Sequence, residues 1–257
     1  MSRTPIPAEE IQTPAIVIRG RAFGESDKIV TFLTRDLGKV TGIAKGAKRS
    51  KRRFVNVLEP FTAVDVTLRI RQHSDLAFIN ACVLAEVYYS FTRDLEKFGY
   101  ASYVLELTDR LIRGQEAGAE TYDLVQAVLR LLDRSQPEPG ILRAFELQLL
   151  RQTGYEPVLH ECQGCGATYR AAGRLFVQPL HGGVRCAACV GESRSHEASE
   201  DTLTRLIGFQ ETTFEEADST PFALSPRSAN EARTLVRSFF ASSLTKPLAS
   251  ERLLEDL

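Results

Sequence analysis

The stretch KIVTFLTRDLGKVTGIAK, residues 28–45, decides the fold of the N-terminal part of the chain. It holds two runs rich in β-branched residues, 28–34 and 39–45, which are separated by a short link that ends at Gly38. Runs of this kind bounded by turn residues are typical of β-strands. The stretch therefore predicts two neighbouring strands, and Gly42 inside the second predicts a bend or bulge there.

Three further segments on either side have the same character. Residues 13–19 lie between Pro14 and Gly20, residues 61–70 alternate β-branched with polar side chains, and residues 75–86 close the set. Five short strands within about seventy residues predict a small antiparallel barrel or sandwich. A five-stranded, partly open barrel of the OB type is the most economical interpretation.

A dense basic run follows the strand predicted at 39–45. Residues 45–53 hold six Lys and Arg and no acidic residue, although the chain as a whole has a net charge of −1. Residues 1–80 have fourteen Lys and Arg against eight Asp and Glu, whereas residues 81–257 have eighteen against twenty-five. The run predicts a flexible cationic loop on the barrel that binds nucleic acid. The candidate DNA-binding residues are Lys39, Lys45, Lys48, Arg49, Lys51, Arg52, Arg53, Arg69 and Arg71.

Aromatic residues near the run have two interpretations. OB barrels pair a positive groove with rings on which bases stack. Phe54, Phe61 and Phe78 are the nearest candidates, but core packing is the favoured role for each.

The periodicity becomes helical from about residue 92. Residues 94–112, 121–134, 139–154 and 225–244 carry apolar residues at helical spacing, and residues 248–257 predict a last short helix. Thr121 and Ser225 are expected N-caps, and Pro139 and Pro226 are expected in first turns.

Four of the five cysteines form two C-x2-C pairs, and the cysteine-rich segment 160–192 lacks helical periodicity. Cys162 with Cys165, and Cys186 with Cys189, match the spacing of a four-thiolate zinc site. Because four protein ligands leave no open position, the predicted ion is one structural Zn²⁺. His160 and His181 are possible substitute ligands, and Cys82 is expected in the core.

The chain shows none of the common catalytic signatures. We find no phosphate-binding glycine loop, no nucleophile elbow and no zinc-protease motif, which predicts a protein that is not an enzyme. The first residues lack the apolar run of a signal peptide, and no apolar run approaches the length of a membrane span. A cytoplasmic protein, associated with the nucleoid if it binds DNA, is expected.

Several motifs occur in an order that resembles the RecO family of bacterial DNA repair proteins. These are GESDKIV, GKVTGIAKGAKR, LEPF, TGYEPVLHECQGCG, CAAC and KPLASERLL. The resemblance implies an OB domain and a helical domain that carries the zinc module. It also implies binding of single- and double-stranded DNA, strand annealing, and recombinase loading on strands coated by single-strand-binding protein. RecR, and in some cases RecF, are the implied partners.

The acidic tail of single-strand-binding protein is a further implied partner. Such a tail needs a pocket that is both basic and apolar. Arg143 and Arg151, or Arg233 and Arg237, are the candidates, although all four could equally be exposed helix charges.

Together these observations predict an α+β multidomain protein. Residues 1–85 form the OB barrel, and residues 86–257 form an all-helical domain with a four-cysteine zinc module inserted at about 159–192. Two other functions stay open: a zinc-containing protein-interaction scaffold, and an OB protein that binds RNA.

Overall fold

The computed structural model describes residues 9–70, 76–114, 118–192, 195–215, 219–241, 243–244 and 246–255. The chain divides into two compact units, residues 1–93 with 112–129 and residues 94–111 with 130–257. None of the described helices is long and apolar enough to cross a membrane.

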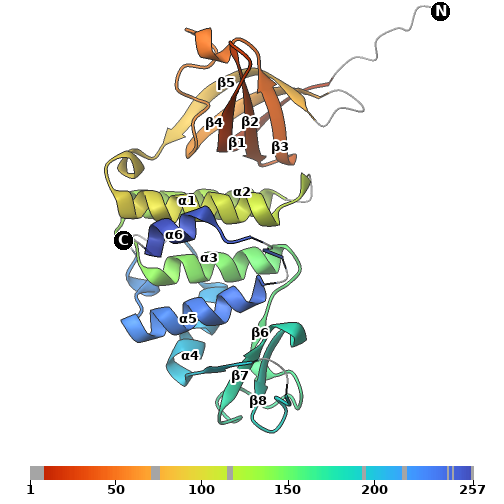
Figure 1. Cartoon of the computed structure of the whole chain (residues 1–257), viewed down its shortest axis with the longest axis vertical. Helices are drawn as coiled ribbons and strands as arrows, with labels where there is room; N and C mark the ends of the chain where they lie inside the picture. Colours follow the sequence, from red (N-terminus) through yellow and green to blue (C-terminus); the bar gives the residue numbers. More distant parts are fainter. Residues whose placement is uncertain are drawn as a thin grey trace, which may run out of the picture. The chain divides into compact units, whose positions relative to one another are not determined.

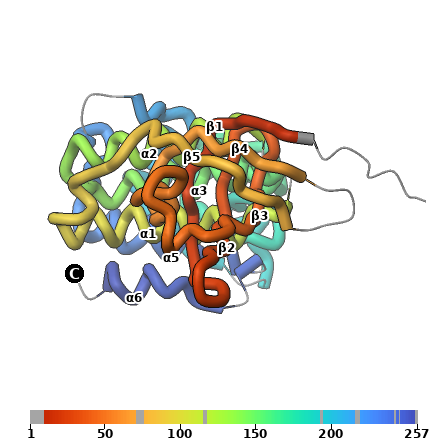
Figure 2. Tube along the Cα trace, turned by 90° about the horizontal axis from the view of Figure 1, so that it is seen from above, coloured from red at the N-terminus to blue at the C-terminus, as the bar shows by residue number. Residues whose placement is uncertain are grey.

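Five strands form a closed barrel in the first unit, in the order β1-β2-β3-β5-β4 (Figures 1 and 2). β3 and β5 pair in parallel, and the other neighbours are antiparallel. The predicted five-stranded OB-type barrel is therefore confirmed. The strands are β1 (Glu9–Phe23), β2 (Asp27–Thr34), β3 (Gly38–Ala44), β4 (Thr62–Ile70) and β5 (Ala77–Val87).

Alternate strand residues fill the barrel, as a period of two requires. Val30 and Phe32 of β2, and Val66 and Leu68 of β4, are fully buried in one apolar cluster. Cys82 lies in the same cluster, which confirms its predicted core position. Burial raises the pKa of the Cys82 thiol to about 12.

Gly42 has a different role from the predicted bend or bulge. The pairing of β2 with β3 runs through Gly42 without a shift, and the irregularities lie in β1 and between β4 and β5. A Cβ atom at Gly42 would lie 2.8 Å from Cγ1 of Ile79. The glycine is needed because β5 approaches β3 closely where the barrel closes.

Helices build most of the second unit (Figure 1). α3 packs against α1, α4 and α5, and α1 packs against α6. Residues 140–147 of α3 are buried without a break, so this helix is the centre of the unit. The helices are α1 (Leu95–Leu111), α3 (Pro139–Gln152), α4 (Glu200–Glu211), α5 (Pro226–Phe239) and α6 (Ala249–Glu255), while α2 (Ala119–Arg134) is divided between the two units.

The predicted helix starts are confirmed except at α2. α3 begins at Pro139, and the Ser225 hydroxyl accepts from the N–H of Ser228 at the start of α5. α2 begins at Ala119, so the expected cap at Thr121 was wrong. The N–H of Thr121 already bonds to Gly118 O inside the first turn.

Two carboxylates from neighbouring helices cap the starts of α6 and α4. Glu106 accepts from the N–H groups of Ala249 and Ser250, at 3.0 and 2.9 Å, and from the Ser250 hydroxyl. Glu231 accepts from the N–H and hydroxyl of Ser199, the N-cap residue of α4. α4 was not predicted from the sequence, and its capping acid lies 32 residues beyond Ser199 along the chain.

The segment between α3 and α4 forms a four-stranded sheet in the order β6-β8-β7-β9. β8 and β7 are antiparallel and are joined through a short 3-10 turn and Gly182, whose φ is 70°. The strands are β6 (Val158–Cys162), β7 (Leu175–Gln178), β8 (Gly183–Cys186) and β9 (His196–Ala198).

Replacing the capping acid Glu106→Gln is expected to lower the free energy of unfolding by about 1–2 kcal/mol at neutral pH. Burial raises the pKa of Glu106, but the N–H groups of Ser250 and Ala249 outweigh it and hold the pKa below its ordinary value. The stabilisation is therefore complete above the unfolded pKa of about 4.3 and is lost as the pH falls below it.

Urea titrations of wild type and variant across this range measure the difference. The exposed Glu215→Gln is the matched control, and it should leave the unfolding midpoint unchanged. An undiminished difference between wild type and Glu106→Gln in acid would contradict the assignment.

Candidate nucleic-acid interface and metal centre

The basic segment, Lys45–Arg53, is anchored to the turn between β1 and β2. The Asp27 carboxylate accepts a 2.9 Å hydrogen bond from the N–H of Gly46, whose φ is 70°. The N–H of Lys48 donates to the carbonyl of Ser26 at 2.9 Å, and Lys48 Nζ reaches the carbonyl of Gly24 at 2.8 Å. The segment is therefore held to the barrel at its first residues, and it is more firmly attached than the sequence indicates.

Asp27 is kept ionised by its surroundings. The N–H of Gly46 and the hydroxyl of Ser26 lower its pKa, and the charges of Lys45 and Lys48 add to the effect. A carboxylate whose pKa is lowered in this way is ionised at neutral pH and accepts the hydrogen bond that fixes the segment.

Apolar residues fix the far end of the segment. Phe54, Val57 and Leu58 are buried in the barrel core, together with Ala47 of the short 3-10 turn η1 (Ala47–Arg49). Phe54 therefore has the favoured core role and is not a stacking platform. Phe61 is also in an apolar contact, since its ring packs edge-on against Phe91 at 5.6 Å.

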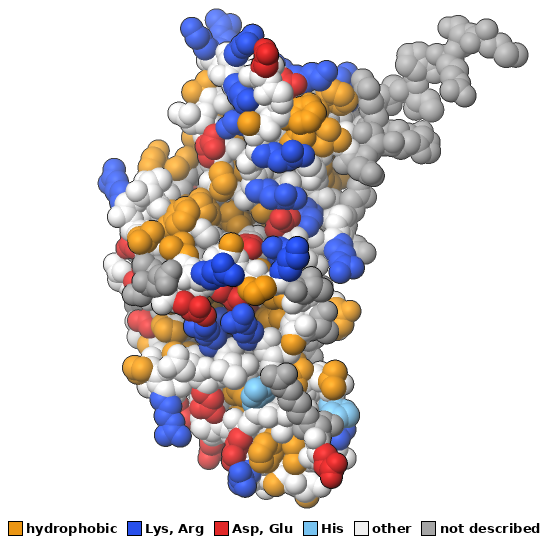
Figure 3. All heavy atoms as spheres, in the orientation of Figure 1, with side chains coloured by type: hydrophobic (Ala, Val, Ile, Leu, Met, Phe, Trp, Pro, Cys, Tyr) orange, Lys and Arg blue, Asp and Glu red, His pale blue; other side chains and the backbone are white. Residues whose placement is uncertain are grey.

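The cations of the segment point outward. Arg53 lies over the Phe54 ring at 5.0 Å and donates to the carbonyl of Lys45. Arg49 is 4.0 Å from Glu25, but both side chains are more than three-quarters exposed, so this pair is weak. In the view of Figure 3, Lys and Arg side chains gather on the part of the surface that the barrel forms. The exposed members are Lys45, Lys48, Arg49, Lys51, Arg52 and Arg53.

Strand register brings further cations to the same end of the barrel. One row of paired residues crosses β1, β2, β3, β5 and β4 in turn. Each member alternates with a core residue, such as Val30, Ala44, Ile79 or Leu68, so the row faces outward. We call it the outer row: Arg21, Ile29, Ile43, Phe78 and Arg69.

The outer row contains one predicted DNA-binding residue, Arg69, and one that the sequence analysis missed, Arg21. Arg19, two residues earlier in β1, is likewise exposed and was also missed. Isolated arginines in a strand give no local signal, and only the register shows that they share a face. Lys39 lies at the opposite end of β3 from Lys45, and Arg71 lies outside the described residues.

The four paired cysteines converge on one point. The Sγ atoms of Cys162, Cys165, Cys186 and Cys189 all lie within 4.8 Å of one another, and that of Cys165 is 3.9 Å from that of Cys186. Tetrahedral zinc at a Zn–S distance of about 2.3 Å places its sulfurs about 3.8 Å apart. Four thiols in this arrangement fit such an ion. His160 and His181 are exposed, and neither belongs to the cluster.

Backbone geometry supports the cysteine cluster. The N–H groups of Cys186 and Gly164 point at Cys162 Sγ, at 3.3 and 3.4 Å. A Cβ atom at Gly164 would lie 2.7 Å from Cβ of Cys189, so only glycine fits between the two cysteine turns. Gly166, after Cys165, has a φ of 72°. Gly164 was not predicted from the sequence, because close approach between turns leaves no local signal.

The thiols of the cluster differ in pKa. Burial raises the pKa of Cys162, but the N–H groups of Cys186 and Gly164 outweigh it and bring the pKa to about 6. Hydrogen bonds with the Cys186 and Cys165 thiols raise the pKa of Cys189 to about 12. Four thiolates so close together repel one another, so full ionisation requires a cation at the centre.

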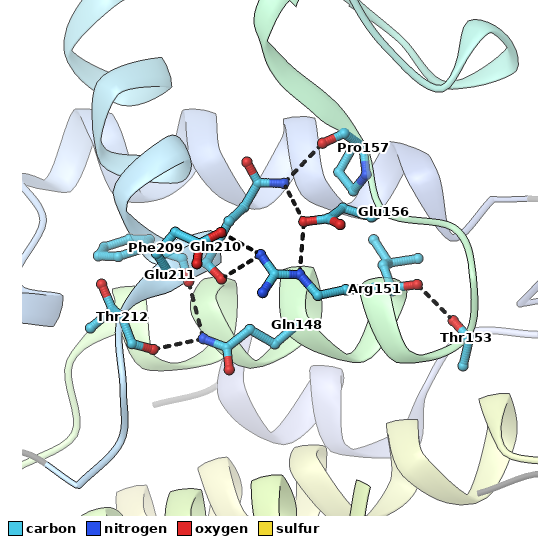
Figure 4. A network of polar contacts seen from close by, with 10 residues as sticks. Gln148, Arg151, Thr153, Glu156, Pro157, Phe209, Gln210, Glu211 and Thr212 are labelled. Carbon is cyan, nitrogen blue, oxygen red and sulfur yellow. Dashed lines mark hydrogen bonds and ion pairs between the residues drawn. The ribbon is translucent and has the colours of Figure 1, made fainter. Parts of the chain in front are cut away.

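The four candidate partner-binding arginines lie in different environments. Arg143 is buried, and it pairs with the buried Glu146 at 2.6 Å; Glu146 also accepts from Tyr103. Arg151 pairs with Glu156 and Glu211 at 2.8 and 2.7 Å and donates to the carbonyl of Gln210 (Figure 4). Its guanidinium thus ties α3 to the end of α4.

Arg233 and Arg237 of α5 line an open pocket of about 850 Å³. Lys246 adds a third cation, and the apolar wall includes Pro179, Leu180, Phe240, Leu244 and Leu248. Arg237 pairs with Glu251 at 2.8 Å, and Arg233 pairs with Glu255. Both arginine side chains are more than 40% exposed, so these pairs are weak.

Comparison with known proteins identifies both parts of the chain. Residues 8–88 match the family model "Recombination protein O N terminal", and residues 92–252 match "Recombination protein O C terminal". A DNA repair protein RecO from Anaeromyxobacter sp. (strain K) is 35% identical over 97% of each chain. Those from Myxococcus xanthus and Syntrophus aciditrophicus are 33% and 30% identical; they match 94% and 96% of this chain, and 96% and 95% of their own lengths. This chain therefore belongs to the RecO family of DNA repair proteins.

Proposed function

We propose that this chain binds single-stranded DNA, anneals complementary strands and mediates recombinase loading on strands coated by single-strand-binding protein. RecR, and in some cases RecF, would act with it. Residues 1–85 are the proposed nucleic-acid-binding domain, and residues 86–257 carry the zinc module and partner contacts. The observation that carries the proposal is the anchored basic segment, with six exposed cations in nine positions.

The proposed mechanism is electrostatic. Anchoring by Asp27 and burial of Phe54 leave the cations of the segment directed at solvent. Two single strands repel each other through their phosphates, and a shared cationic surface lowers that repulsion so that bases can pair. Weak exposed pairs such as Arg49–Glu25 give way readily to phosphates.

No covalent bond is made or broken in this mechanism. We therefore propose that the protein is not an enzyme. The family is named for DNA repair, and that name includes no catalytic activity. Turnover of nucleic acid or nucleotide by the pure protein would overturn this part of the proposal.

The cysteine cluster is a proposed structural zinc site. Four thiolates complete a tetrahedron and leave no open position for water or substrate. When bound, the ion would link the two cysteine pairs and balance the charge of the thiolates. The N–H groups of Gly164 and Cys186 hold the Cys162 sulfur in place. The proposed role is to fold the insert, because binding free energy at such sites is folding free energy.

The pocket lined by Arg233 and Arg237 is the proposed site for the acidic tail of single-strand-binding protein. It combines cations with an apolar wall, which a tail with a terminal carboxylate and apolar side chains requires. Arg143 and Arg151 are less suited, because one is buried with Glu146 and the other is held by Glu156 and Glu211.

Binding of single-stranded oligonucleotides should weaken as salt rises. If about six phosphates are contacted, log affinity against log salt has a slope of roughly −4. Replacing Lys48, Arg49, Arg52 and Arg53 by Ala should reduce the slope to roughly −1.4 and weaken binding by about tenfold or more, whatever the base sequence.

Fluorescence anisotropy over a salt series measures both quantities. The matched control removes four exposed arginines elsewhere, Arg93, Arg113, Arg205 and Arg252, and should leave the slope unchanged. Retained affinity in the segment variant would move the site elsewhere, and a preference for RNA competitors would favour an RNA-binding function.

The purified protein should contain one zinc ion per chain, and Cys165→Ser should lose it. Acid should weaken zinc binding, since protons compete for the thiolates. Metal analysis and thermal unfolding, with and without chelator, measure the loss. The fifth cysteine provides the control, since Cys82→Ala removes a thiol but should keep the zinc. Stoichiometric zinc in Cys165→Ser would contradict the site.

The tail peptide of single-strand-binding protein should bind wild type, and Arg233→Ala with Arg237→Ala should weaken it by about tenfold or more. Isothermal titration measures the affinity. The control pair is Arg205→Ala with Arg252→Ala, and a peptide amidated at its C-terminus tests the carboxylate. Unchanged binding in the Arg233/Arg237 variant would exclude this pocket.

A further inference from the structure

Phe78 lies where the barrel closes, at the start of β5. It pairs with Ile43 across the parallel seam and with Arg69 across the antiparallel one. The next residue, Ile79, is buried in the core, so the Phe78 ring lies on the outer surface. The ring is half-buried and keeps part of its surface open to solvent.

Among the described residues, two cations lie over this ring. Nζ of Lys45 is 5.5 Å from the ring centroid, and Cζ of Arg69 is 5.2 Å from it. Lys45 is the first residue of the basic segment, and Arg69 is the next member of the outer row. Nε of Arg69 is buried and has no hydrogen-bond partner among the described residues, so moving the guanidinium breaks no bond at that atom.

The rest of the outer row extends the surface away from Phe78. Ile43 beside the ring is buried, Ile29 is half-buried, and the exposed Arg21 ends the row on β1. A partly open aromatic ring with cations at its sides suits a nucleotide better than a phosphate alone. The base has an apolar face, and the phosphates on either side of it are anionic.

The expected contributions to affinity favour a stacked base over the two cations at the ring. An exposed cation–π contact changes an equilibrium by a factor of about two to five. A base stacked on an aromatic side chain changes affinity by about 5- to 150-fold. A base can therefore take the ring face, and the displaced ammonium and guanidinium groups can bind the neighbouring phosphates.

We propose that Phe78 is a stacking platform for one nucleobase, and that it favours single-stranded over double-stranded DNA. In a duplex both faces of each base are already stacked, so the ring offers nothing to a double strand. The cations of the basic segment would bind the phosphates of single-stranded and double-stranded DNA alike. This inference rests on the proposed DNA binding and adds a contact that depends on the base.

Affinity of Phe78 variants tests the platform. Phe78→Ala and Phe78→Leu should each weaken binding of a single-stranded oligonucleotide by about 5- to 150-fold. Duplex affinity and the salt slope should stay unchanged, since no charge is removed. Phe78→Tyr should restore single-strand affinity, and Phe78→Leu separates loss of the ring from loss of apolar packing.

Fluorescence gives a direct signal, because the chain contains no Trp. In Phe78→Trp the single indole should be quenched when an oligonucleotide binds, and an oligonucleotide made of abasic sites should not quench it. Tyr89→Trp is the control, since Tyr89 is 67% exposed and lies beyond the far end of β5. Its emission should not depend on the presence of bases.

Two results would overturn the platform: equal quenching by abasic and intact strands, or wild-type affinity in Phe78→Ala and Phe78→Leu. Failure of the proposed function looks different, since wild type would then bind no single-stranded DNA. If wild type binds with the expected salt slope and the Phe78 variants match it, only the platform fails.

Discussion

The hydrogen bond from Gly46 N–H to the Asp27 carboxylate is the contact on which the proposed nucleic-acid surface depends. It fixes the start of a segment whose like charges repel one another. Phe54 and Leu58 fix the far end by entering the core. The chain thus uses one ionised acid and a few apolar side chains to present six cations in a defined place.

The barrel gives those cations their neighbours. Closure between β3 and β5 requires Gly42, since any side chain there would collide with Ile79. The same closure places Phe78 next to Ile43 and within reach of Lys45. The cations and the aromatic ring therefore meet because of strand register and not because of proximity in sequence.

The elements with a local signal were predictable from sequence, and those that depend on distant partners were not. β-Branched runs predicted the strands, and C-x2-C spacing predicted the cysteine cluster. α4 is the exception, because Ser199 caps it locally and Glu200 and Asp201 stand in its first turn, and this local signal was overlooked. Arg21 was missed because only strand register shows which residues share its face. Gly164 was missed because its role comes from the close contact between the two cysteine turns. Arg143 looks like a surface charge in sequence, yet α3 is buried around it.

Lysine acetylation footprinting tests the central claim most directly. Lys45, Lys48 and Lys51 are exposed in the basic segment, and Lys246 is exposed in the helical unit. Single-stranded DNA should protect the three lysines of the segment from acetylation and leave Lys246 reactive. Protection of Lys246 with no change at Lys45, Lys48 and Lys51 would contradict the account.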